Sequence, residues 1–146
     1  MSFQQLLAAH RVQPHTTSKR ELGLRAIVSR DLQDAYVPGF SSDRQFATAY
    51  NAVLQLAKMA MACAGYRVVD QGHHLTTFEA LEFAIGQSVS QLASYFDTCR
   101  RKRNMLDYDI ANVVTDTEVT ELLEKAEELR ELVEQWITTH YPHFAR

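Results

Sequence analysis

The chain has 146 residues, of which 46% are hydrophobic, so it is the size of a single domain and can build one packed core without metals or disulfides. Its formal net charge of −3 excludes a whole-protein attraction to nucleic acid, and a polyanionic partner would need a local basic patch. No apolar run approaches about 18 residues and no signal-peptide pattern is present, so we expect a single cytoplasmic domain, residues 1–146, without membrane contact.

The first elements are predicted to be helices. Residues 3–12 have apolar side chains at helical spacing until Pro14 ends the pattern, which predicts a short N-terminal helix. Ser18 and Glu21 then have the spacing of a capping box, in which each side chain satisfies a free backbone amide of the other. This spacing predicts a second helix that ends near Pro38.

The next helix is rich in alanine. Ser41 and Ser42 are candidate N-caps, and apolar residues follow at three- and four-residue steps as far as Gly65. Small side chains allow a neighbouring helix to approach closely, so we expect this helix to lie deep in the core. A non-periodic connection follows, long enough to cross one end of a helical bundle.

Two further helices complete the pattern. A second capping-box spacing at Thr76 and Glu79 predicts one long helix that reaches about residues 95–98. The last helix is predicted to open at residues 116–117 and to end before Pro142. It carries seven glutamates opposite its apolar stripe, which is typical of a solvated face.

These elements predict an all-α fold. Strand-like alternation never lasts more than about four residues, and no internal repeat is present. Connections of moderate length favour antiparallel neighbours. We therefore expect an up-down bundle of four to five helices, with the core at about residues 40–137.

A polar stretch between the last two predicted helices is the candidate site. Its basic part is Arg100, Arg101, Lys102 and Arg103, the predicted nucleic-acid-binding residues. Cations near the carboxyl end of a helix are favoured by its dipole, which is the structural explanation. Four in a row also repel one another, and phosphate or acidic side chains would neutralise them. Helical geometry places Arg100 and Arg103 on one side.

The polar part of the stretch follows directly. Asp107, Tyr108 and Asp109 lie close enough to the arginines for charge-assisted hydrogen bonds that would lock the helix junction. The alternative is a polar cavity in which an arginine polarises a phosphate, Asn104 orients the ligand, and Tyr108 or an aspartate handles a proton. Both interpretations remain open at this stage.

The string R-R-K-R-N-M-L-D-Y-D, from Arg100 to Asp109, resembles the signature of HEPN domains, in which an Arg, usually followed by Asn, precedes a His by about four to six residues. The helix and loop before it, with Asp43-Arg44-Gln45, Gly65-Tyr66-Arg67 and Gly72-His73-His74, are similar to one branch of that family. The resemblance covers about residues 40–136.

The resemblance implies an all-helical, HEPN-like bundle of four or five helices, a homodimer with the motif near its interface, and no cofactor. Many relatives are metal-independent endoribonucleases that act as toxins or in phage defence, and others pair with a minimal nucleotidyltransferase. Arg103 and Asn104 match the Arg-Asn pair, but Tyr108 stands where a His is expected. Tyr, with a pKa near 10, is a poorer proton-transfer group near neutral pH.

Three functions follow as hypotheses. The first is a HEPN-like module that binds RNA or a nucleotide-bearing partner through Arg100, Arg103, Asn104 and Tyr108, with weak or no catalysis, in a toxin–antitoxin, defence or stress-response setting. The second is a metal-independent endoribonuclease that uses the catalytic residues Arg103 and Asn104, with Tyr108 or Asp109 in place of the His. The third is a buried network that only stabilises a dimer.

The remaining titratable residues are weaker candidates. His74 would line the motif cavity if its loop folds back, whereas the adjacent His73 and His74 diverge and do not suggest a metal site. Cys63 and Cys99 lack a CxxC partner and lie in apolar helical patterns, which predicts reduced, buried thiols. We therefore expect no metal ligand among them.

Overall fold

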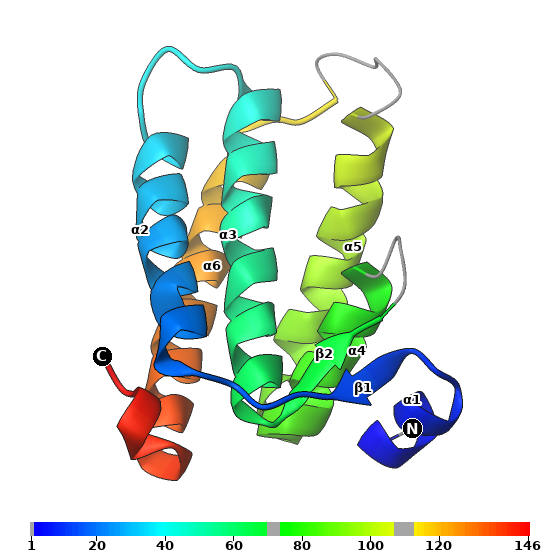
Figure 1. Ribbon diagram of the computed structural model, residues 1–146. Helices are drawn as coiled ribbons and strands as arrows, with labels where there is room; N and C mark the ends of the chain where they lie inside the picture. Colours follow the sequence, from blue (N-terminus) through cyan, green and yellow to red (C-terminus); the bar gives the residue numbers. More distant parts are fainter. Residues whose placement is uncertain (1, 70–73, 107–112) are drawn as a thin grey trace.

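The computed structural model describes residues 2–69, 74–106 and 113–146 and confirms the predicted all-α bundle. Helices α2 and α5 run in one direction and α3 and α6 in the other, so the four long helices form an up-down arrangement (Figure 1). The elements in chain order are α1 (Phe3–Ala8), β1 (Val12–Pro14), the 3-10 helix η1 (Lys19–Gly23), α2 (Leu24–Ala35), α3 (Ser42–Cys63), β2 (Tyr66–Val68), α4 (His74–Ile85), the 3-10 helix η2 (Gln87–Val89), α5 (Ser90–Leu106), α6 (Asp116–His140) and the 3-10 helix η3 (Pro142–Phe144).

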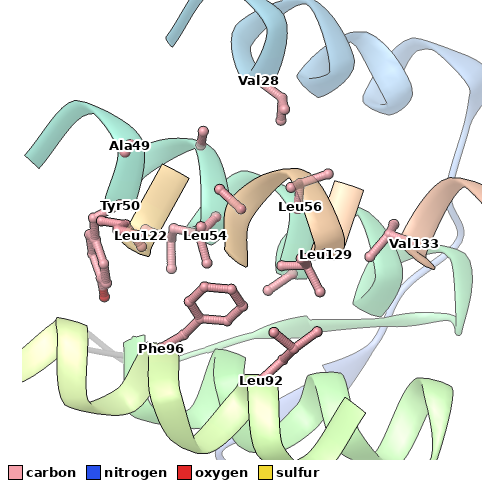
Figure 2. Close-up of a cluster of buried hydrophobic side chains, with 14 of the residues drawn as sticks. Val28, Ala49, Tyr50, Leu54, Leu56, Leu92, Phe96, Leu122, Leu129 and Val133 are labelled. Carbon is pink, nitrogen blue, oxygen red and sulfur yellow. The ribbon is translucent and has the colours of Figure 1, made fainter. Parts of the chain in front are cut away.

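Helix α3 is the centre of the bundle. The Ser41 hydroxyl accepts a hydrogen bond from the Arg44 amide at 3.2 Å, which confirms one of the two predicted N-caps. Four alanines of α3 are fully buried, namely Ala49, Ala52, Ala57 and Ala60, and they let α2 and α6 pack closely against it. Side chains of α3, α5 and α6 meet in one apolar cluster, in which Phe96 is completely buried (Figure 2).

The core also includes residues before the predicted range of 40–137. Leu22, Val28 and Leu32 are buried against the α3 helix and belong to the main cluster. The predicted capping box is present, because the Ser18 amide donates to Glu21 Oε1 at 3.2 Å. The segment it starts is a 3-10 turn that leads into α2.

The long helix predicted from Thr76 to about residues 95–98 is wrong. The helical conformation is interrupted at Gly86, where φ is +111°, a backbone conformation that L side chains rarely adopt. Helices α4 and α5 are therefore separate. Thr76 is not the N-cap either: it lies inside α4, 3% exposed, and its hydroxyl accepts from Arg11 Nη2 at 2.7 Å. A capping-box spacing alone did not distinguish a cap from a buried threonine.

The N-terminal helix is shorter than the predicted 3–12. It ends at Ala8, and His10 has a positive φ of 56° that turns the chain away. The following residues form β1, which pairs antiparallel with β2 with Val12 opposite Val68. The sequence did not predict this small sheet. Each strand has three residues, too few for an alternating pattern to be recognised in the sequence.

The last helix begins at Asp116, within the predicted start at residues 116–117. Thr115 is its N-cap, and Thr115 and Glu118 form a capping box in which the Glu118 amide donates to Thr115 Oγ1 at 3.1 Å. Most glutamates of α6 are exposed, but Glu134 is only 7% exposed. It receives Arg25 Nε and Nη2 at 2.7 and 2.9 Å, which ties α6 to the start of α2.

Candidate functional site

The basic run lies within α5. The sequence predicted that the helix would end near residues 95–98, but α5 continues to Leu106, so Arg100 to Asn104 occupy its last turns. Helical spacing therefore applies to them, and Arg100 and Arg103 lie on the same side of α5. Arg101 and Asn104 are exposed, whereas Arg100, Lys102 and Arg103 are half-buried.

Two carboxylates close to the run neutralise part of its charge. Asp97 Oδ1 accepts from Arg100 Nε at 2.7 Å, and Asp97 Oδ2 lies 3.3 Å from Arg101 Nη2. Lys102 Nζ lies 3.0 Å from Glu118 Oε2, across the groove between α5 and α6. Asp97 thus orients Arg100 from one turn away and fixes the direction in which its guanidinium points.

A buried tyrosine faces the two inward arginines. Tyr50 of α3 is 2% exposed, and its hydroxyl shares a hydrogen bond of 3.0 Å with His74 Nδ1 (Figure 2 shows the Tyr50 oxygen at the margin of the apolar cluster). Burial raises the pKa of Tyr50 above its usual value, although the nearby positive charges of Arg100 and Arg103 act in the opposite direction. The hydroxyl therefore stays protonated.

His74, which the sequence suggested as a lining residue of the motif cavity, is hydrogen-bonded to Tyr50. It is the first residue of α4, and packing of α4 against α3 brings its ring within 5.8 Å of the Tyr50 ring, centroid to centroid. Phe78, one turn later on α4, contacts Tyr50 edge to face at 5.9 Å and holds the tyrosine ring from the other side. The imidazole is thus bonded to a buried hydroxyl that lies within the electrostatic influence of Arg100 and Arg103.

Sequence reasoning missed Tyr50. It lies in the apolar stripe of α3 and was assigned to the core, which is correct for its ring. The available signal was chemical: a buried tyrosine hydroxyl needs a hydrogen-bonding partner, so a core tyrosine predicts a polar group nearby. Tyr108 and Asp109, which the sequence also placed in the site, lie outside the residues that the structure describes, as does His73.

A pocket of about 500 Å³ lies beside this cluster, between α5 and α6. Phe46, Tyr95 and Met105 contribute apolar surface to it, and the ion-paired Lys102 and Glu118 stand at its rim. Cys99, which is buried and reduced as predicted, also lines it, and burial raises the pKa of its thiol to about 12. The thiol is therefore not a nucleophile here.

The described residues contain no cluster of three or more histidine, cysteine or acidic side chains that could hold a metal ion. Within the same described ranges, no helix combines the length and apolar character needed to cross a membrane. Comparison of the chain with protein-family models, curated proteins and solved structures gave no match.

Proposed function

We propose that this chain is a HEPN-like RNA-binding module whose site is the inward side of the α5 carboxyl end. The observation that carries the proposal is that the positive charges of Arg100 and Arg103 lie near the buried hydroxyl of Tyr50, which is itself bonded to His74. Guanidiniums held in fixed directions bind phosphate oxygens in a bidentate manner, and RNA supplies a row of phosphates.

The local charge supports the same ligand. Arg100, Arg101, Lys102 and Arg103 carry four positive charges within one turn of α5; Arg100 and Arg101 pair with Asp97, and Lys102 pairs with Glu118. A basic patch therefore exists on a protein whose overall charge is −3. Such a patch attracts polyanions over about a Debye length of 10 Å, which suits a local RNA contact rather than wrapping by a long duplex.

The test is the salt dependence of binding to short single-stranded RNA, followed by fluorescence anisotropy. Each phosphate neutralised contributes a slope of about −0.7 to a plot of log K against log salt for single strands. Arg103→Ala should weaken binding and flatten that slope by about 0.7. Arg20→Ala is the matched control, because Arg20 is an exposed arginine on η1, outside the site.

Absence of salt-dependent binding, or equal losses in Arg103→Ala and Arg20→Ala, would show that the site does not bind RNA. The interaction hypothesis predicts a different outcome. If the network serves only to stabilise a homodimer, Arg103→Ala lowers the melting temperature and shifts dimer dissociation, measured by sedimentation, without changing any RNA titration. The two readouts together distinguish a binding site from a structural junction.

A second candidate function is a metal-independent endoribonuclease, and the Tyr50–His74 pair favours it. The motif position that would hold a histidine has Tyr108 in this sequence, yet His74 supplies an imidazole to the same site from α4. In such cleavage the RNA 2′-hydroxyl attacks the adjacent phosphorus while a base takes its proton. The bond from phosphorus to the 5′-oxygen breaks, that oxygen takes up a proton and leaves, and arginines stabilise the charge that develops on the phosphorus-bound oxygens.

Cleavage of varied RNAs in a chelator tests this candidate. We expect cyclic phosphate ends, loss of cleavage in Arg103→Ala and His74→Ala, and a smaller loss in Tyr50→Phe, which leaves the imidazole without its hydrogen-bonding partner. If the protein binds RNA but leaves it intact after long incubation, the endoribonuclease hypothesis is excluded and the RNA-binding hypothesis stands. The same proposal places the chain in the cytoplasm, as a homodimer or with a nucleotidyltransferase-type partner, in a toxin–antitoxin, defence or stress-response system.

A further inference from the structure

A second pocket lies at the opposite end of α3, away from the basic run. It has a volume of about 300 Å³ and is enclosed by the carboxyl end of α3, the β2 strand and the segment before α2. That segment crosses the lower end of α3 in Figure 1. Two hydrogen bonds hold it there: the His15 amide donates to the Gly65 carbonyl at 2.8 Å, and the Thr17 hydroxyl donates to the Ala62 carbonyl. The volume is within the range of small-molecule sites.

Lys58 projects into this pocket from α3. Its neighbours there include the apolar side chains of Leu24, Met61 and Val68, and it forms no ion pair with any residue that the structure describes. Burial lowers the pKa of Lys58 below its usual value, and no carboxylate opposes that effect. A half-buried lysine in an apolar setting is the arrangement in which the amine acts as a nucleophile.

The other polar residues of the pocket complement an amine. His15 Nε2 is bonded to Glu21 Oε2 at 2.7 Å, so a carboxylate fixes the orientation of an imidazole at the pocket wall. The same interaction, together with the positive charge of Arg67, lowers the pKa of Glu21 despite the opposing effect of burial, which is the largest single influence. The exposed Arg67 lies at the mouth, where it can receive an anionic group.

We propose that this pocket binds a small carbonyl compound that carries an anionic group, and that Lys58 Nζ forms a reversible imine with it. The lysine nitrogen attacks the carbonyl carbon, the carbon–oxygen π bond breaks, and a carbinolamine forms. Its hydroxyl takes a proton, delivered through His15, and leaves as water as the carbon–nitrogen double bond forms. The amine and the carbonyl compound thus give the imine and water without any oxidation or reduction, and Arg67 holds the anionic group.

The residues that line the pocket suit a carbonyl compound with an anionic group better than a simple anion. An anion alone needs only Arg67, whereas the apolar wall and the paired histidine line the same pocket as the amine. A half-buried amine whose pKa is lowered by burial adds more readily to an aldehyde or a 2-oxo acid than an exposed lysine does. The site is separate from the RNA site of the previous subsection, and each proposal stands or fails by itself.

Reductive trapping tests the proposal on the intact protein. The chain is incubated near neutral pH with glyoxylate and cyanoborohydride, and the modified lysines are identified by peptide mass spectrometry. The internal competitors are Lys19, Lys102 and Lys125, of which Lys19 is exposed and the other two are ion-paired. We expect Lys58 to be modified several-fold faster than Lys19, although Lys19 is more accessible.

Matched variants and a neutral probe complete the experiment. Arg67→Gln should remove the preference for Lys58 with glyoxylate but leave it intact with propanal, which has no anionic group. His15→Asn should slow trapping at Lys58 several-fold with both probes. The proposal would be overturned if labelling followed solvent exposure, with Lys58 modified most slowly in the wild-type chain. It would also be overturned if glyoxylate were trapped at Lys58 equally in the wild type and in Arg67→Gln. The competition within one chain needs no variant to fold.

Discussion

Replacing Tyr50 by phenylalanine removes one hydroxyl from the centre of the candidate site and leaves the ring in place. The ring keeps its edge-to-face contact with Phe78 at 5.9 Å, so the apolar packing is unchanged. The variant loses the hydrogen bond of 3.0 Å to His74 Nδ1. A net loss of about 1 kcal/mol is expected for such a bond, because the unfolded state regains its hydrogen bonds to water. For a chain of this length that corresponds to a fall of about 2–4 °C in melting temperature.

Thermal and urea denaturation followed by circular dichroism measure this effect. Tyr66→Phe is the matched control: Tyr66 is half-buried and stacks on Phe3 with ring centroids 4.2 Å apart, but its hydroxyl has no hydrogen bond to another described side chain. We expect that control to change stability by only a few tenths of a kcal/mol. A double-mutant cycle with His74→Ala should give a coupling free energy of about 1 kcal/mol.

Two results would refute this reasoning. If Tyr50→Phe is as stable as the wild type, the hydroxyl has no net stabilising bond to His74. If the effects of Tyr50→Phe and His74→Ala are additive, the two residues do not interact, and the imidazole has no structural reason to lie at the arginines. The endoribonuclease candidate would then lose its proton-transfer pair, whereas the RNA-binding proposal would still rest on Arg100 and Arg103.

Three further predictions concern other parts of the bundle. Glu134→Gln should destabilise the protein by about 2–3 kcal/mol in urea denaturation, because it leaves the half-buried Arg25 without its counter-charge, whereas the exposed Glu131→Gln should have almost no effect. Gly86→Ala should cost about 1–2 kcal/mol because φ is +111° there, and an unchanged melting temperature would contradict the strained turn. Glu118 has a lowered pKa, caused first by its backbone hydrogen bond with Thr115, so the ionised form is favoured by folding and its contribution is present at neutral pH and is lost as the pH falls below about 4. The stability difference between wild type and Glu118→Gln should therefore disappear in acid, and a constant difference would disprove the linkage.

Local sequence signals located most helices correctly. Ser41 caps α3 and Pro142 follows the end of α6, because a cap or a proline acts on backbone groups within one turn. The same local chemistry failed at Thr76 and Gly86. Thr76 has the spacing of a cap but is buried against Arg11, and a single glycine inside an apolar pattern did not reveal that the helix breaks there. Both outcomes depend on residues far away in the chain.

The sequence by itself determined the helical class, the basic run and the Arg-Asn pair, because composition, period and charge are properties of neighbouring residues. The tertiary structure decided which groups meet. Packing of α3 and α4 brings Tyr50 to His74, β2 and the segment before α2 line the Lys58 pocket, and Arg25 meets Glu134 across 109 residues of chain. Such contacts minimise buried, unpaired polar groups over the whole fold, and no window of sequence contains both partners.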